Sequence, residues 1–187
     1  MGIQGVHRKR IGNPIMISDD ILKKAGRTGY KSGSWYTNTL MNELAEYQKK
    51  NFNQFDTNFI IPGDLIFFSY SAKYPQKYKF WDQHPLVYVI EVSPRQGLFF
   101  GANVHYLNPS YRGGITESFL NKQGVVNAPR KTLKNYLFGN VSSELYKVPR
   151  DDWKGVSLLP TESFVNKRGQ KVPKYQVWDY PDSLSSP

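Results

Sequence analysis

The amino-acid sequence predicts an α+β protein with a small, mostly antiparallel, partly open β-barrel at its core, peripheral short helices and extended N- and C-terminal arms. Three observations support this fold class. Residues 64–70, 80–90 and 97–107 are rich in aromatic and β-branched side chains and alternate with turn-forming residues, which is typical of consecutive antiparallel strands. Aromatic residues make up 15% of the chain, so large rings must supply much of the buried surface. Residues 35–52 form the longest stretch with helical spacing of apolar side chains.

The first 34 residues are predicted to form an arm with one short helix. Glycines and a proline interrupt residues 1–17, which also contain three consecutive basic side chains: Arg8, Lys9 and Arg10. Residues 18–26 carry helix signals, with Ser18 placed to cap the start and Gly26 to end it. Because so few apolar side chains cannot build a core, we expect this arm to become ordered on neighbouring proteins.

Residues 35–160 are predicted to form a single domain, followed by a C-terminal arm over residues 161–187. Leu40, Leu44 and Tyr47 recur at helical spacing in residues 35–52 and predict one apolar helix face. The barrel core is expected over residues 60–107, and its loop at residues 71–79 is long enough to project from the surface.

Three further features complete the predicted domain. A tight turn at residues 93–97 joins the second and third predicted strands. Two more helices are predicted: one at residues 116–123, with Gly124 as its stop, and one at residues 132–138. Short strands that complete the sheet are predicted at three later positions: residues 145–148, 156–159 and 175–178.

Composition excludes several classes of function. The chain has no cysteine, which excludes disulfides, thiolate zinc sites and cysteine nucleophiles, and with them the cell-wall cysteine peptidases whose barrels open in a similar way. No glycine-rich segment has the spacing of a phosphate loop. No apolar run has the length of a signal peptide core or a membrane span, so we expect an intracellular protein, or part of an assembly built inside a cell, with no membrane partner.

The acidic and histidine side chains do not make a convincing catalytic or metal site. His84 and His105 could share a metal ion with Asp82, but no further ligand has suitable spacing. We therefore interpret both histidines as packed, hydrogen-bonded core residues. Acid pairs that could serve as general acid and base are found at three places: Asp19 with Asp20, Asp151 with Asp152, and Asp64 with Asp82. Helix-start or turn positions account for these pairs. The sequence therefore predicts no catalytic residue, metal or cofactor.

The remaining signal combines aromatic and basic side chains. The formal net charge is +10, which favours acidic partners such as nucleic acid or acidic proteins. Candidate partner-binding residues occur in and beside the loop at residues 71–79: Tyr74, Lys77, Tyr78, Lys79 and Trp81. Such a set can stack on bases and hold phosphates, but tyrosine and tryptophan also dominate protein interfaces. We weigh a protein interface above nucleic acid on this evidence, with Arg8, Lys9 and Arg10 as further contacts.

Three blocks of sequence are similar to small virion proteins of contractile-tailed bacteriophages, the myoviruses. The blocks are residues 62–70, residues 81–87 with the spacing Asp-x-x-Pro-Leu-Val, and residues 101–109 with Gly-x-Asn-x-His-Tyr-Leu-x-Pro. Six residues define the shared motif: Asp64, Asp82, Pro85, Asn103, His105 and Tyr106. Trp81 and His84 depart from the residues usual in these relatives, and the blocks cover about a quarter of the chain.

The resemblance implies a virion protein without known catalysis, in a group that includes DNA end protectors and tail or baseplate components. The sequence therefore predicts a non-enzymatic structural or assembly protein of the tail, baseplate or head–tail junction. In that role it binds other virion proteins through its arms and aromatic loop, in several copies of a symmetric assembly. The alternative is a DNA-binding protein that protects the ends of the packaged genome, which the charge of +10 favours.

Overall fold

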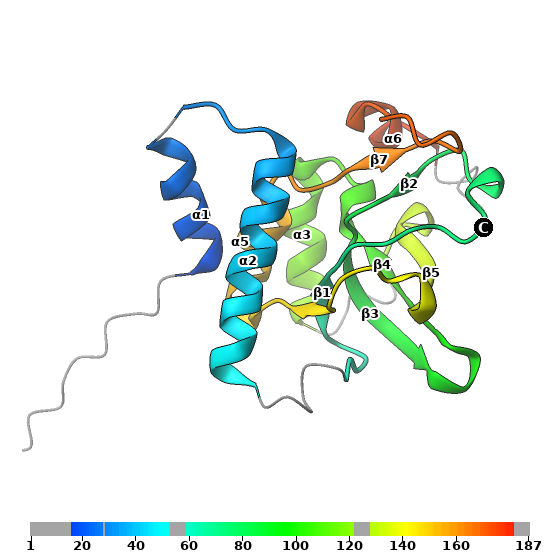
Figure 1. Cartoon of the computed structure of the whole chain (residues 1–187), viewed down its shortest axis with the longest axis horizontal. Coiled ribbons are helices and arrows are strands. Elements are labelled where there is room, and N and C mark those ends of the chain that lie inside the picture. Colours follow the sequence, from blue (N-terminus) through cyan, green and yellow to red (C-terminus); the bar gives the residue numbers. More distant parts are fainter. Residues whose placement is uncertain (1–15, 28, 53–58, 122–127, 182–187) are drawn as a thin grey trace, which may run out of the picture.

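The computed structural model of the chain describes residues 16–27, 29–52, 59–121 and 128–181. Figure 1 shows a group of helices on the left and a curved antiparallel sheet on the right, with a smaller sheet and a short helix above it. The predicted combination of helices with an antiparallel sheet is therefore confirmed. Within the described ranges, none of the helices is both long enough and apolar enough to cross a membrane.

The helices combine capping signals with a buried face. Those of the described residues are α1 (Ile17–Gly26), α2 (Gly33–Asn51), α3 (Pro109–Leu120), α5 (Trp153–Leu158) and α6 (Lys174–Trp178). The helix predicted at residues 35–52 is confirmed as α2, which starts two residues earlier because Ser32 caps it by accepting a hydrogen bond from the Trp35 amide at 3.2 Å. Leu40 and Leu44 lie fully buried on its inner face.

The helix predicted at residues 18–26 is confirmed as α1, but Ser18 does not cap it. Met16 is the N-cap residue, and Ser18 lies inside the first turn, where its amide and hydroxyl donate to the buried carboxylate of Asp152. Ile21 is fully buried, and α1 packs against α2 and α5 of its own chain. The division into arms and one domain stays a prediction, and Arg8, Lys9 and Arg10 lie outside the described residues.

The main sheet has five antiparallel strands. They are β1 (Leu65–Phe67), β3 (Leu86–Ser93), β4 (Leu98–Asn103), β5 (Leu133–Leu137) and β6 (Tyr146–Lys147), in the order β5-β4-β3-β1-β6. The predicted turn at residues 93–97 joins β3 to β4, and Gly97 takes a φ of +67° there.

The predicted barrel is not confirmed, because the five-stranded sheet is open, with β5 and β6 at its edges. The sheet nevertheless curves. Just beyond β1, Tyr70 forms an isolated antiparallel bridge with Val141, and the Ser142 amide donates to the Ser69 carbonyl at 2.9 Å. These bonds bring the end of β1 towards the segment after β5 around a cluster of buried rings that includes Phe68, Phe99 and Tyr136.

All three predicted core strands are shorter or interrupted, and the first of them, predicted over residues 64–70, is β1 alone. Residues 80–90 contain β2 (Trp81–Asp82) and then β3, separated by a turn in which the His84 amide donates to the Asp82 carboxylate at 3.1 Å. The strand predicted at residues 97–107 ends at Asn103, whose side chain accepts from the His105 amide at 3.0 Å. Residues 104–106 therefore form a buried 3-10 turn, and the strand predicted to continue through them is wrong there.

Four other predicted elements need correction. Residues 132–138, predicted as a helix, contain β5, because Tyr136 packs into the buried rings beside β4. Residues 156–159 and 175–178, predicted as strands, belong largely to the short helices α5 and α6. α5 buries Trp153 and Val156 on the core, and α6 buries Val177. The helix predicted at residues 116–123 is α3, which starts earlier because Asn108 caps it and Pro109 occupies its first turn.

β3 and β4 approach each other closely where they pair at Gly101. Gly101 lies opposite Val89 in this ladder. A Cβ atom built on Gly101 would lie 2.5 Å from the Tyr88 carbonyl oxygen and against the Val87 side chain. The two strands can therefore approach this closely only because residue 101 has no side chain.

Candidate nucleic-acid interface

Pairing between two distant segments creates a basic surface. β2 pairs antiparallel with β7 (Phe164–Val165), with Trp81 opposite Val165 and Asp82 opposite Phe164. The predicted aromatic loop precedes β2, and a second basic segment follows β7. Neither residues 71–81 nor residues 163–178 contain an aspartate or glutamate. The fold therefore brings together two stretches that carry positive charge only.

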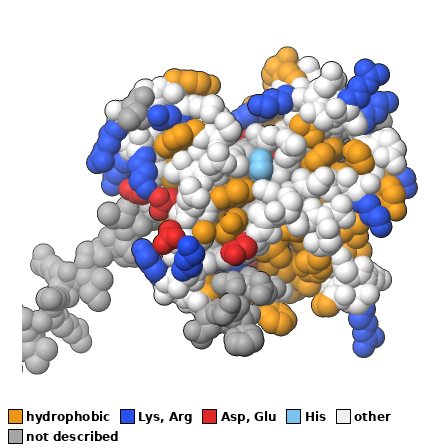
Figure 2. All heavy atoms as spheres, in the orientation of Figure 1, with side chains coloured by type: hydrophobic (Ala, Val, Ile, Leu, Met, Phe, Trp, Pro, Cys, Tyr) orange, Lys and Arg blue, Asp and Glu red, His pale blue; other side chains and the backbone are white. Residues whose placement is uncertain are grey.

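A groove of about 410 Å³ runs between these two segments, and we call it the basic groove. Its lining residues are Gln76, Lys77, Tyr78, Lys79, Asn166, Lys167, Arg168 and Gln170. We refer to the four charged ones as the groove cations: Lys77, Lys79, Lys167 and Arg168. Figure 2 shows Lys and Arg side chains along the upper right of the molecule, around β2 and β7, and shows Asp and Glu side chains mainly over the helices at the left.

The second wall of the groove is a tight turn held by one side chain. The Asn166 carbonyl oxygen Oδ1 accepts from the amides of Arg168 at 2.9 Å and Gln170 at 3.1 Å. Gly169 has a φ of +75°, which a residue with a side chain rarely adopts. The turn therefore holds Lys167 and Arg168 at its exposed tip.

The aromatic loop forms the first wall. The Tyr74 ring is 45% exposed, and the ammonium groups of Lys73 and Lys77 lie 5.3 Å and 4.9 Å from its centre. The Lys79 ammonium lies 4.3 Å from the ring centre of Tyr180. Lysines held over tyrosine rings beside an open groove can contact backbone phosphates while a ring contacts a base.

The structure separates the predicted partner-binding residues into three groups. Lys77, Tyr78 and Lys79 line the groove, whereas Tyr74 lies exposed on the same loop. Trp81 belongs to β2 and is only partly exposed. Lys167 and Arg168 were not predicted to belong to this site, although the lack of acidic residues over residues 163–178 is a signal in the sequence.

A buried polar network lies beside this surface and contains three of the six motif residues. The Asp82 carboxylate accepts from the Asn103 amide at 3.1 Å and pairs with His105 Nδ1 at 2.8 Å. His105 Nε2 lies 3.1 Å from the Thr161 hydroxyl. The order Asp–His–Thr is that of a hydrolase triad, but His105 and Thr161 are 0% exposed, which leaves no access for a substrate. The network joins β2, β4 and the segment before β7.

The other motif residues are also placed by the fold. Asp64 closes the turn before β1 by accepting from the Ile61 amide at 3.0 Å, and it pairs with Lys147 at 3.3 Å. Pro85 is buried between the Asp82 turn and β3. Tyr106 is buried under the aromatic loop against Phe80. Among the described residues, no group of three or more His, Asp or Glu side chains is arranged to hold a metal ion.

The Asp82 carboxylate should make the fold sensitive to acid. Burial alone would raise its pKa, but His105 and the hydrogen bonds from His105, Asn103 and the Ser163 amide hold it below the usual value of 3.8. A carboxyl with a lowered pKa in the folded state stabilises the protein above its unfolded pKa. We therefore expect thermal stability to decrease as the pH falls from about 5 through 3.8 and below.

Replacing Asp82 with asparagine tests this expectation. We expect Asp82→Asn to lower the free energy of unfolding at pH 7 by about 2 kcal/mol, because buried donors lose their charged acceptor. Thermal melts between pH 7 and pH 3 should also show a smaller loss of stability on acidification in this variant. Asp19→Asn, at an exposed position, is the control. An unchanged acid response in Asp82→Asn would contradict the assignment.

One comparison with known proteins gives a match. The family model described as phage T4 terminal DNA protecting protein matches residues 14–129. The match covers more than half of the 187 residues and includes the aromatic loop, but it ends before the turn that carries Lys167 and Arg168. No curated protein and no solved structure matches the chain.

Proposed function

We propose that this chain, which belongs to the phage T4 terminal DNA protecting protein family, binds the ends of the phage genome and shields them. The family match favours the DNA-binding alternative of the sequence analysis over a structural role in the tail or baseplate. A bacteriophage protein of this family is expected to be associated with the virion. The chemistry proposed here is binding alone, without catalysis, metal or cofactor.

The basic groove is the observation that carries this proposal. Its four cations lie on two walls about the same hollow, and the segments that form the walls contain no acidic side chain. Cations spaced along a groove can follow a phosphate backbone and release its counterions, which supplies most of the affinity of sequence-independent binding. A net charge of +10 adds long-range attraction.

A second role, assembly with other virion proteins, is supported by exposed apolar side chains. Leu22 is 52% exposed and Tyr30 is 100% exposed, and both line an open groove of about 600 Å³ beside α1 and α2. Exposed side chains of this kind mark protein interaction sites. We propose that virion proteins contact this side, that the terminal arms add contacts, and that several copies assemble together, while the basic groove faces DNA.

The two roles make different predictions for purified protein. We expect the full chain to bind blunt-ended linear DNA at physiological salt, to prefer it to closed-circular DNA of the same sequence, and to slow exonuclease digestion from the ends. The logarithm of the affinity should fall with the logarithm of salt concentration with a slope of about −0.9 per phosphate contact. Titration from 0.05 to 0.2 M salt with both DNA forms is the measurement. Binding that ignores ends and disappears by physiological salt would leave only the assembly role.

A further inference from the structure

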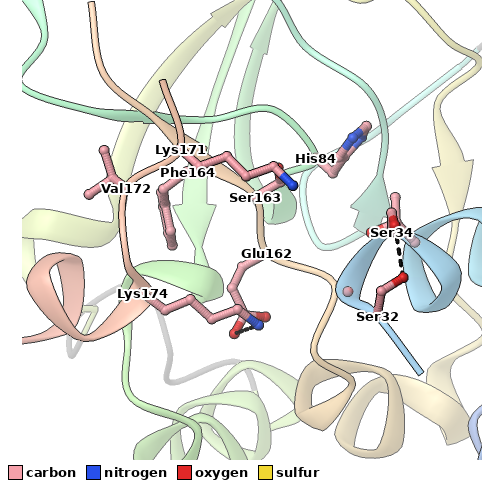
Figure 3. Close-up of a pocket in the computed structure, with 11 residues that line it drawn as sticks. Ser32, Ser34, His84, Glu162, Ser163, Phe164, Lys171, Val172 and Lys174 are labelled. Carbon is pink, nitrogen blue, oxygen red and sulfur yellow. Dashed lines mark hydrogen bonds and ion pairs between the residues drawn. The ribbon is translucent and has the colours of Figure 1, made fainter. Parts of the chain in front are cut away.

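A second hollow lies next to the basic groove. It is a pocket of about 240 Å³ between the start of α2, the turn at His84 and the chain around β7 and α6 (Figure 3). Thr37, Glu162 and Phe164 are buried and form its inner wall. Its remaining lining residues are Ser32, Gly33, Ser34, His84, Ser163, Lys171, Val172 and Lys174. We call this hollow the end pocket.

The end pocket has an excess of positive charge. Glu162 contributes a carboxylate that pairs with Lys174 at 3.0 Å and with the buried guanidinium of Arg112 at 3.4 Å. Burial alone would raise the pKa of Glu162, but His105, Arg112 and Lys174 hold it below its usual value, so this carboxylate is ionised at neutral pH. Lys174, Arg112 and Glu162 together therefore carry a net charge of +1.

Lys171 supplies another positive charge. Its side chain extends across the pocket in Figure 3, towards Ser163 and His84. Among the described residues Lys171 has no ion pair, so its ammonium group is available to a ligand. The charges of Lys171, Lys174, Arg112 and Glu162 sum to +2.

Hydrogen-bond donors are added at the opposite wall. The hydroxyls of Ser32 and Ser34 lie 2.9 Å apart at the exposed mouth of the pocket. The amides of Gly33 and Ser34, the first two of the 19-residue helix α2, are also at this wall, whereas the Trp35 amide already donates to Ser32. The first amides of a helix have no partner within the helix itself. Their partial positive charge favours an anion, in addition to the excess charge of the lysines.

We propose that the end pocket receives the terminal phosphate monoester of a DNA end. The pocket is smaller than the roughly 300–1,000 Å³ of sites that enclose a whole small molecule, and a phosphate group suits its size. A phosphate monoester carries a charge of about −1.5 to −2 at pH 7 and offers three acceptor oxygens. An internal phosphodiester carries a single charge and continues on both sides. The pocket thus provides a chemical basis for telling an end from the middle of a duplex.

The position of the pocket relative to the basic groove supports this assignment. Gln170 lines the groove, whereas its neighbour Lys171 lines the pocket and forms an isolated bridge with Val165 at the end of β7. The two hollows therefore lie on either side of one chain segment. A strand whose backbone follows the groove can place its terminal group in the pocket. This inference rests on the proposed function, because it assumes that the groove holds DNA.

The test compares blunt duplexes of one sequence that differ only in their terminal groups. The full chain is titrated at 0.15 M salt with duplexes carrying a 5′-phosphate, a 3′-phosphate or hydroxyls alone. We expect the best phosphorylated duplex to bind about tenfold more tightly than the hydroxyl form. The phosphorylated terminus that gives this gain identifies which strand end enters the pocket. Inorganic phosphate should abolish the roughly tenfold gain and leave the affinity for the hydroxyl form unchanged.

Two variants separate the pocket from the groove. Lys171→Gln should reduce the ratio of the two affinities to about one. Lys167→Gln removes one charge from the groove instead. It should weaken the binding of both duplexes equally and leave the ratio of their affinities unchanged. Both positions are exposed, and thermal melts verify that the variants fold. Equal affinity of the wild type for all termini, or an unchanged ratio in Lys171→Gln, would overturn the pocket assignment. If the wild type still preferred linear to circular DNA, the proposed function would stand without the pocket assignment. If that preference were absent as well, both the pocket assignment and the proposed function would be refuted.

Discussion

A variant in which glutamine replaces all four groove cations is expected to bind DNA ends about 10³-fold more weakly than the wild type at 0.15 M salt. Each phosphate contact contributes about 0.9 to the slope of log affinity against log salt. Relative to 1 M salt, one contact is then worth about a factor of five at 0.15 M, and four contacts multiply to about 10³. The slope itself should become shallower by about 3.6. Fluorescence anisotropy with an end-labelled duplex across a salt series measures both quantities.

The control for this variant changes net charge equally at a distance from the groove. Its four exposed positions, each changed to glutamine, are Lys23, Lys49, Lys50 and Arg95. These residues belong to α1, α2 and the β3–β4 turn rather than to the groove. We expect only a modest decrease in affinity, from the weaker long-range field. If the control lost as much affinity as the groove variant, DNA binding would depend on net charge alone and the groove would not be the site.

The replacement Gly101→Val is expected to destabilise the fold by at least about 3 kcal/mol, at the upper end of the range for overpacked cores. Its side chain would meet the Tyr88 carbonyl oxygen, which belongs to the backbone of β3 and cannot rotate away. The β3–β4 ladder would have to separate at this close approach. Chemical denaturation at pH 7 measures the change in the free energy of unfolding.

Gly139→Ala is the matched control for that experiment. Gly139 lies just after β5, and a Cβ atom built there meets no other atom within 4 Å. We expect a change of less than about 0.5 kcal/mol in either direction, as for surface substitutions away from special features. If Gly101→Val had the same denaturation midpoint as the wild type, the strands would not be packed as closely as described.

Much of the fold could be predicted because local signals and tertiary packing agree there. The helix spacing of Leu40 and Leu44 and the aromatic runs before and after residues 93–97 each determine an element that the structure confirms as α2, β3 or β4. The helix prediction for residues 132–138 was wrong because the apolar side chains of this segment have little periodicity. Its strand conformation comes from pairing with β4 and from burial of Tyr136, neither of which is a local property.

The candidate site was predicted only in part, for a related reason. Tyr74, Lys77, Tyr78 and Lys79 lie close together in the sequence, so composition alone singled out their loop. The contribution of Lys167 and Arg168 depends on the β2–β7 pairing, and two-residue strands leave almost no pattern in a sequence. The motif residues Asp82, Asn103 and His105 could be recognised by resemblance. Their shared hydrogen bonds depend on a turn at residues 104–106, where the sequence had predicted the continuation of a strand.

The β2–β7 pairing also has a consequence for the order in which the molecule matures. The hydrogen bond from the Ser163 amide to Asp82 joins residues 81 positions apart, and both walls of the basic groove depend on this junction. During synthesis the aromatic loop emerges long before its partner turn, so a growing chain has one wall and no groove. Under the proposed function, we therefore expect affinity for DNA only after residues 163–170 have been synthesised and paired with β2, so that shorter growing chains do not occupy genome ends.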